Sequence, residues 1–293
     1  MFSRTDKANM AAGVMVLLLS LSALAFGVPQ NASQYIPYVV KVISVYVCSG
    51  VIIHPHWILT AAQCFGSSKS AQIHWNNLVV DSTKVVIHPD YISVLEPGTV
   101  ILGNNDLALI QIKETINFSR CVSKIELDGS EWPQDYTKYN RPCMAFGTSR
   151  HRATSAKENY VHARLYKAEH GDQACECLPL NLKPQLVCMK EADETFCAED
   201  LGGPLICDNK LVAILHTLYD LRNCKKHSTK VAPACDKRTT ISVCTYICPY
   251  LTWIKHYVPT IPDRPPSCRS SPIITPSALV VLFYFVFIVI THS

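Results

Sequence analysis

The sequence has few charged residues and lacks any cluster of charge of one sign. Charged residues make up 17% of the 293 residues, the formal net charge is +4, and no run of lysine and arginine exceeds two residues. Nucleic-acid binding normally needs a basic patch, so we expect no nucleic-acid partner. The 48% hydrophobic content is typical of a globular protein with apolar ends rather than a disordered chain.

Metal-binding spacing is also missing from the 14 cysteines. No close cysteine pair is matched by a second Cys/His pair at zinc-finger spacing, which disfavours a reduced metal protein. In a chain with a secretory signal, this number of cysteines indicates an oxidising compartment and a disulfide framework. We expect neither a cofactor nor a metal.

The N-terminal residues have the pattern of a secretory signal peptide. Arg4 and Lys7 precede a nearly unbroken apolar run over residues 10–27, and the Ala-Leu-Ala at 23–25 fits a cleavage site. We assign residues 1–25 to the signal peptide. A retained signal anchor is the less favoured alternative, because the run is short for a membrane span.

The C-terminal end lacks the cation that normally follows a stop-transfer helix. After a Pro/Ser-rich stalk at 259–277, the hydrophobic tail 278–293 has an apolar run followed only by Thr-His-Ser. This pattern is typical of a GPI-attachment signal, with Ser270 and Ser271 as candidate anchor residues. A single transmembrane helix is the alternative. Either way, we expect a membrane-anchored protein at the cell surface or in the secretory pathway.

Two Asn-x-Ser triplets, at Asn31 and Asn117, are acceptor sequences for N-glycosylation. Both suit exposed positions of a secreted chain. We therefore expect a glycoprotein.

The body of the chain has almost no helical periodicity. Its one helix-like pattern is 249–258, where Tyr250, Ile254 and Val258 share a face. Short stretches rich in Val, Ile and Tyr lie at 38–47, 49–53, 57–61, 79–88, 107–112, 143–147, 161–168, 205–207, 210–216 and 239–247. Many short strands with one late helix predict an all-β sandwich or barrel.

Two stretches resemble the signatures of the trypsin/chymotrypsin-like serine proteases. Residues 59–64, Leu-Thr-Ala-Ala-Gln-Cys, are similar to the family's Thr-Ala-Ala-His-Cys, and Ala-Glu-Asp-Leu-Gly-Gly-Pro at 198–204 to its Gly-Asp-Ser-Gly-Gly-Pro. The strand at 105–110 resembles the one that carries the family's aspartate. The resemblance implies that residues 26–258 form two antiparallel six-stranded β-barrels with a C-terminal helix and a cleft between the barrels.

The resemblance also implies four disulfides. They pair Cys48 with Cys64, Cys143 with Cys207, Cys177 (or Cys175) with Cys188, and Cys197 with Cys224. The cysteines outside these bridges favour extra disulfides, among them Cys121 with Cys248 by analogy with trypsins; they are Cys121, Cys175, Cys235, Cys244, Cys248 and Cys268.

The reactive side chains depart from the family's pattern. Gln63 stands where the family has its general base and Leu201 where it has its nucleophile, while Asp106 matches the orienting acid. A glutamine amide does not titrate near neutral pH, and leucine has no heteroatom to attack a carbonyl. We therefore predict an inactive homologue that binds an extracellular protein. The alternative is a residual or unconventional serine-type endopeptidase that still uses Asp106.

Other positions of the active site are changed as well. Glu199 replaces a glycine that provides one oxyanion donor in the family, and Thr195 replaces the aspartate by which trypsin selects basic residues. The family's Ser-Trp-Gly substrate strand reads His-Thr-Leu at 216–218, which weakens the expectation that substrates or protease inhibitors bind there.

Asp200 matches the aspartate that pairs with the N-terminus formed by activation. Residues 25–37 contain neither Ile-Val-Gly-Gly nor a basic residue to cut after, so Asp200 needs another partner or a zymogen-like loop.

Three histidines, His54, His56 and His216, could lie near the cleft. A substitute base among them is less favoured than a structural role. The insertion 224–244 carries several basic residues, and a docking surface there is less favoured than a solvated loop.

Overall fold

The computed structural model of the chain divides into two compact units, Met1–Gln34 and Tyr35–Ser293. All residues that the structure describes belong to the second unit; they are 36–75, 78–92, 95–96, 99–100, 104–133, 141–148, 161–171, 174–175, 178, 180, 182–190, 196–220 and 240–268. The expected signal peptide and tail, Asn31, Ser270 and Ser271 lie outside them.

Six antiparallel strands close into a first barrel, barrel 1, in the order β1-β2-β3-β8-β5-β4. They are β1 (Val39–Ile43), β2 (Val47–His54), β3 (Trp57–Thr60), β4 (Gln72–Trp75), β5 (Leu78–Ile87) and β8 (Ala108–Ile112). The apolar run of β2 is fully buried, whereas much of β5 is exposed. Gly50 faces the interior so closely that a β-carbon there would lie 2.8 Å from a methyl group of Val42, so a larger residue would force strand β1 outward.

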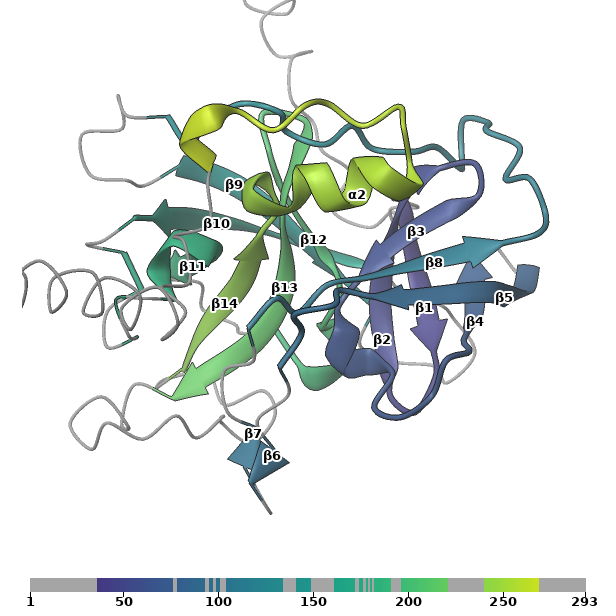
Figure 1. Cartoon of the computed structure of the whole chain (residues 1–293), viewed down its shortest axis with the longest axis horizontal. Helices are drawn as coiled ribbons and strands as arrows, with labels where there is room; N and C mark the ends of the chain where they lie inside the picture. The colour runs from purple at the N-terminus through teal and green to yellow at the C-terminus, as the bar shows by residue number, and fades with distance from the viewer. Residues whose placement is uncertain are drawn as a thin grey trace, which may run out of the picture. The chain divides into compact units, whose positions relative to one another are not determined.

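A second barrel, barrel 2, closes in the order β10-β11-β14-β13-β12-β9. Its strands are β9 (Arg141–Gly147), β10 (His162–His170), β11 (Leu186–Lys190), β12 (Pro204–Cys207), β13 (Lys210–Asp220) and β14 (Thr240–Tyr246). One hydrophobic cluster takes in residues of both barrels, for example Leu109 of barrel 1 and Leu205 of barrel 2, and Figure 1 shows the barrels side by side. The predicted fold of two six-stranded barrels is confirmed. A separate two-stranded sheet is formed by β6 (Leu95–Glu96) and β7 (Thr99–Val100).

The expected C-terminal helix is present as α2 (Leu251–Tyr257), preceded by the 3-10 helix η5 (Cys248–Tyr250). The packed chain continues beyond it to Cys268, into the stretch expected to be a stalk. Ile261 is buried, and Pro262 lies so close to Gly129 that a β-carbon on this glycine would be 2.7 Å from the proline ring. A disulfide between Cys248 and Cys268 fixes the end of this segment, where the 3-10 helix η6 (Pro266–Cys268) ends.

Two of the disulfides implied by the resemblance, Cys48–Cys64 and Cys143–Cys207, are present. Cys188 pairs with Cys175, the second of its two expected partners. The other partner, Cys177, lies outside the described residues.

Cys197 is also disulfide-bonded, and its expected partner Cys224 lies outside the described residues. The expected pair of Cys121 and Cys248 is wrong, because Cys248 pairs with Cys268. Cys244 is a buried free thiol in β14, so the expectation of an extra disulfide is wrong at this position. Its surroundings are apolar strands, and burial raises the pKa of the thiol.

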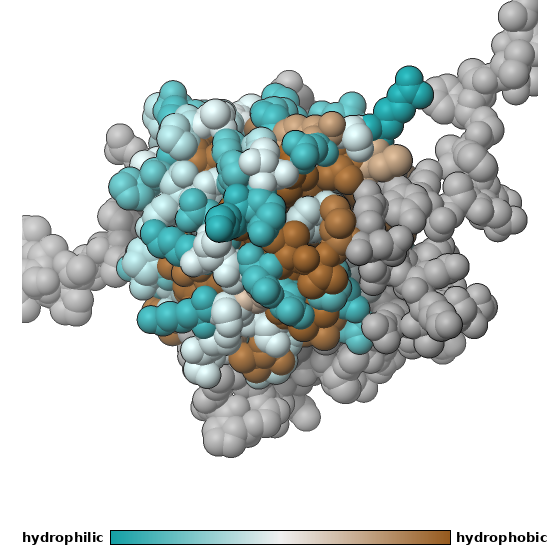
Figure 2. Space-filling model, turned by 90° about the vertical axis from the view of Figure 1, so that its right-hand side faces the viewer, coloured by the Kyte–Doolittle hydropathy of each residue, from teal (hydrophilic) through white to brown (hydrophobic). Residues whose placement is uncertain are grey.

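The surface of barrel 1 carries scattered apolar side chains. Val45, Tyr46, Leu78 and Val79 are each more than half exposed, and Figure 2, which faces the barrel 1 side, shows brown apolar residues among polar ones. Scattered exposure of this kind is normal for a soluble domain. Among the helices that the structure describes, none is long and apolar enough to span a membrane.

Candidate functional site

Asp106 is the centre of a buried polar cluster where the barrels meet. It lies two residues before β8, and only 1% of it is exposed. The preceding residue, Asn105, has a left-handed φ of 56°, which asparagine tolerates better than most residues. The Asn105 side chain donates to the carbonyl of Asp90 at 2.8 Å and accepts from the Tyr250 hydroxyl at 2.9 Å. These contacts fix the backbone that presents Asp106.

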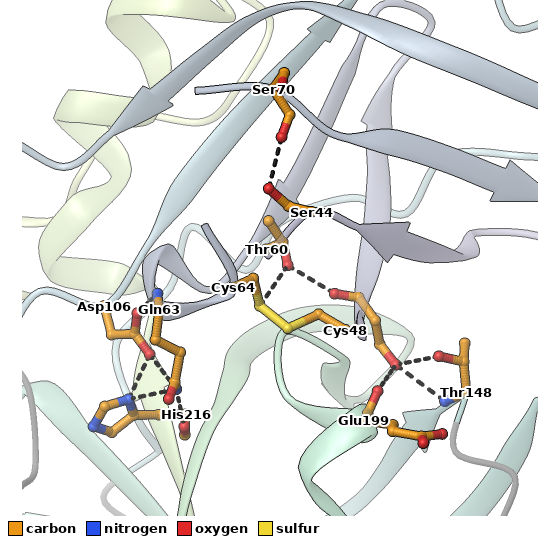
Figure 3. The surroundings of a disulfide bond; sticks show 11 residues. Ser44, Cys48, Thr60, Gln63, Cys64, Ser70, Asp106, Thr148, Glu199 and His216 are labelled. Atoms are coloured by element: carbon orange, nitrogen blue, oxygen red, sulfur yellow. Dashed lines mark hydrogen bonds and ion pairs between the residues drawn. A yellow bond between two sulfur atoms is a disulfide. The ribbon is translucent and has the colours of Figure 1, made fainter. Parts of the chain in front are cut away.

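Three N–H groups donate to the Asp106 carboxylate (Figure 3). The backbone N–H of Gln63 reaches Oδ1 at 2.8 Å, its side-chain Nε2 reaches Oδ2 at 2.7 Å, and Nδ1 of His216 reaches Oδ2 at 2.6 Å. Nε2 of Gln63 also donates to the carbonyl oxygen of His216. Gln63 lies in the 3-10 helix η1 (Ala62–Cys64) beside barrel 1, and His216 lies in β13 of barrel 2. The cluster therefore satisfies a buried carboxylate with donors from both sides of the junction.

His216 is almost completely buried, with 2% of its surface exposed. Its Nδ1 is committed to Asp106, and its Nε2 is buried with no hydrogen-bond partner in the part of the chain that the structure describes. Of the three histidines considered from the sequence, this is the one that joins the cluster. His54 and His56 lie at the turn between β2 and β3, where burial and the neighbouring His56 and Lys124 lower the pKa of His54.

Leu201, which the sequence resemblance aligns with the family's nucleophile, lies in a loop that contacts both barrels. Its carbonyl accepts from the backbone N–H of Ser49 in β2, and Gly202 donates to the carbonyl of Leu215 in β13, each at 2.8 Å. Gly202 has a φ of 82°, and a β-carbon there would collide with the carbonyl of Ser49, so the loop requires glycine. The half-buried Leu201 side chain packs against the hydrophobic core.

The turn before Leu201 is the 3-10 helix η3 (Ala198–Asp200). In this turn, Asp200 donates its backbone N–H to the carbonyl of Cys197 at 3.0 Å. The carbonyl of Glu199 accepts from the Ser49 hydroxyl at 3.2 Å, and the same hydroxyl is 2.9 Å from Oγ1 of Thr148. Figure 3 shows Glu199 and Thr148 at this contact. Glu199, the counterpart of an oxyanion glycine, is thus tied into the inter-barrel contact through its carbonyl.

Asp200 does have a partner within the barrel. Its side chain is fully buried, Oδ1 accepts from Nε2 of His162 at 2.9 Å, and Oδ2 accepts from the backbone N–H of Cys197 at 2.8 Å. Gly147 lies opposite His162 between β9 and β10, and a β-carbon at Gly147 would collide with the Asp200 carboxylate. Glycine at this position makes room for the pair.

The strand that resembles the family's substrate strand is buried in this protein. His216 and Thr217 are each 2% exposed and Leu218 is 4% exposed. On one side this part of β13 pairs with β14, and on the other side its pairing with β12 ends at Ile214. A peptide laid along this edge would need exposed backbone groups, and the His216 carbonyl already accepts from Gln63.

The remaining expectations fall partly outside the described residues. Thr195 and most of the basic insertion, 221–239, are among the residues that the structure leaves undescribed. Asn117 is exposed in an irregular segment after β8. Within the described ranges, no group of three or more His, Cys, Asp or Glu side chains could hold a metal.

Gln63 and Asp106, both singled out from the sequence, lie in hydrogen-bond contact, whereas no sequence pattern pointed to His162. The signal was the missing partner of Asp200, which the sequence left open. Choosing His162 required the register of β9 and β10, which places it opposite Gly147. That register is a long-range property of the barrel rather than of any local motif.

Comparisons with known proteins identify the family of the chain. The family model described as Trypsin matches residues 25–254, and the chain belongs to this family. Rat tonin (Rattus norvegicus) is 27% identical over 237 residues, covering 75% of this chain and 83% of tonin. Trypsin II-P29 of Gallus gallus is 26% identical over 239 residues, covering 76% and 84%.

A solved structure supports the fold. The mouse serine protease neuropsin matches with a TM-score of 0.59 and 22% sequence identity, covering 76% of this chain and 94% of neuropsin. At that identity, the likeness concerns the fold alone.

Proposed function

We propose that this chain is a proteolytically inactive member of the trypsin family that is tethered outside the cell and works by binding a protein partner. The observation that carries the proposal is the bonding of Gln63. Its side-chain nitrogen donates both to Asp106 and to the His216 carbonyl. An amide nitrogen has no lone pair to accept a proton, so the residue at the base position cannot activate a nucleophile.

Two further features support inactivity. Leu201 has no atom that can attack a carbonyl, which removes the covalent route. Glu199 brings a carboxylate into the turn that supplies the family's oxyanion donors, and a negative charge there opposes a developing oxyanion. Base, nucleophile and oxyanion site are therefore all altered.

The alternative, a residual or unconventional endopeptidase, is favoured by one observation. Asp106 still holds a histidine, His216, at 2.6 Å, as an acid and base of a protease would be arranged. The buried position of the His216 Nε2 opposes this alternative, because a general base has to reach its substrate or nucleophile.

The test uses a fluorophosphonate probe on the purified full-length protein. We expect no labelling of the wild type and none of His216→Ala. Labelling of the wild type that disappears on heat denaturation contradicts the proposal, and its loss in His216→Ala then identifies the alternative. The revertant Gln63→His/Leu201→Ser should label weakly because Glu199 remains, and adding Glu199→Gly should increase labelling.

The buried substrate strand bears on the kind of partner. Because His216, Thr217 and Leu218 are inaccessible, we infer that the partner does not lie along β13 as a substrate would. Immobilised protein tested against a Kunitz-type inhibitor should therefore give no binding signal, with active trypsin as the positive control. Binding that an excess of trypsin abolishes would show that the groove is open.

The location is part of the same proposal. The signal at 1–25 and the tail at 278–293 support membrane tethering, by a GPI anchor at Ser270 or Ser271 or by a transmembrane helix. Phosphatidylinositol-specific phospholipase C should release the protein from cells, and retention would favour the helix.

Exposed Asn117 supports N-glycosylation there, and Asn31 is the second site. Peptide N-glycosidase F should lower the apparent mass of the wild type, and by less in Asn117→Gln.

A further inference from the structure

Asp200 and His162 form a buried pair that the proposed function does not use. The carboxylate is fully buried, and 15% of the His162 side chain is exposed. Burying a carboxylate without a partner is strongly unfavourable, and removing one member of a buried pair typically destabilises the fold severely. The pair is therefore a requirement of this conformation of the loop 196–203.

An aromatic ring completes the arrangement. Phe196 is fully buried; it stacks on His162 with ring centroids 5.5 Å apart and an interplanar angle of 29°, and lies 5.3 Å from the ring of Tyr166. Asp200 thus meets a nitrogen donor backed by a bulky apolar group. An isoleucine N-terminus formed by activation cleavage would bring the same two groups, an ammonium and an apolar side chain.

We propose that His162, backed by Phe196, replaces the activation N-terminus in this protein. In the uncut chain, His162 supplies a hydrogen bond to the buried Asp200 carboxylate. The loop 196–203 therefore reaches its final conformation on folding, without proteolytic processing. This inference is independent of whether the protein cleaves peptides.

The loop transmits the pair's effect to both barrels. Gly203 donates to the Asp200 carbonyl at 3.0 Å, Ser49 donates to the Leu201 carbonyl at 2.8 Å, and Gly202 donates to the Leu215 carbonyl at 2.8 Å. Loss of the His162 side chain should therefore release amides in the loop and at its contact with β2. Amides in β11 and β14, which the loop does not bond, should stay protected.

The experiment measures hydrogen exchange by mass spectrometry on the full-length secreted protein. In His162→Ala, the amides of 196–203 should exchange on the order of a hundredfold faster than in the wild type. The matched control is His170→Ala, at the other end of β10, where the imidazole hydrogen-bonds the Leu186 carbonyl at 2.7 Å. It should leave the loop's exchange unchanged. Equal exchange in wild type and His162→Ala overturns the proposal.

A chemical rescue separates this role from general packing. Millimolar Ile-Val dipeptide, which has a free ammonium and an apolar side chain, should restore protection in His162→Ala, whereas N-acetylated Ile-Val should not. If His162→Ala is not secreted, His162→Gln keeps an N–H donor and should show a smaller increase in exchange.

The intact mass of the wild type should show no cleavage between residue 26 and the folded domain other than signal removal. A functional form cut near residue 37 contradicts the proposal.

Discussion

The two buried aspartates offer a direct comparison of two regions of the molecule. Asp106 and Asp200 are 1% and 0% exposed, and each accepts a hydrogen bond from a histidine. At Asp106 the histidine comes from the opposite barrel, because His216 lies in β13. At Asp200 both groups belong to barrel 2, because His162 lies in β10. The same pair of side chains therefore ties two barrels together at one site and orders a single loop at the other.

The bonding of Asp106 is consistent with the proposed function, because the carboxylate is satisfied with a glutamine at position 63. Glutamine at position 63 donates to Asp106 through its backbone and through its side chain, so the carboxylate remains satisfied without an imidazole there. The inter-barrel contact is kept by His216. Glutamine at position 63 therefore leaves no unsatisfied charge at the junction.

The largest expected effect is that of Asp106→Ala. Removing the carboxylate leaves donors of Gln63 and His216 buried without an acceptor, and we expect a loss of about 3–5 kcal/mol in the free energy of unfolding. Urea unfolding of the secreted protein measures it. Asp263→Ala is the control, since its partner Lys255 is 2.6 Å away at the surface and exposed pairs contribute little. A small effect of Asp106→Ala would mean that the barrels do not depend on this cluster.

The disulfide between Cys248 and Cys268 involves neither aspartate, so its removal provides a reference for the stability effects of the two pairs. Replacing Cys248 and Cys268 by serine opens a bridge with a sequence separation of 20, and loop-closure entropy predicts a loss of about 3 kcal/mol. Thermal unfolding should show the change, and exchange at 196–203 should not respond. A faster loop in this variant would show that the C-terminal segment and the loop are coupled.

Double-mutant cycles sharpen the contrast between the two pairs. Asp106→Asn with His216→Gln, and Asp200→Asn with His162→Gln, should each give a coupling energy of about 1–3 kcal/mol. We expect the Asp106 and His216 variants to change exchange at η1, and the Asp200 and His162 variants to change exchange in the loop 196–203 and at its contact with β2. Identical exchange patterns would contradict the distinction between a pair that joins the two barrels, at Asp106, and a pair that orders one loop, at Asp200.

The smallest expected effect concerns pH. His88 lies between Tyr250 and Trp253, with ring centroids 5.3 and 4.9 Å away, and burial lowers its pKa, partly offset by Asp90. The unfolded state therefore takes up a proton first, and this residue's contribution is complete above the unfolded pKa of about 6.5 and declines as pH falls below it. The drop in melting temperature between pH 7.5 and 5.5 should be smaller in His88→Gln. The exposed His256→Gln should behave as the wild type.

Much of the fold could be predicted from the sequence, because its signals are local. Valine- and isoleucine-rich stretches and the two motifs around Gln63 and Leu201 indicated the barrels, and the spacing of Cys48 and Cys64 matched a bridge that is present. The choice between Cys175 and Cys177 was left open, since both lie within reach of Cys188 along the chain. Only the fold places Cys175, with its φ of 53°, at the bridging distance.

The remaining features depend on contacts that pattern does not encode. Cys244 was expected to pair because six cysteines were left over, yet its position in β14 between β11 and β13 surrounds it with strands. His216 and His162 act through partners 110 and 38 residues away. Such pairs follow from barrel register, which sequence reasoning could not fix.

The bridge at Cys268 has a mechanical consequence. Any tension applied from beyond this residue enters the domain through the disulfide to Cys248, at the beginning of η5 and directly before α2. The nine residues between Val258 and Cys268 cannot extend under this tension, because the disulfide carries the tension past them. The tension therefore reaches the chain next to the buried side chains Leu251 and Ile254 and does not separate the segment 259–267 from Gly129.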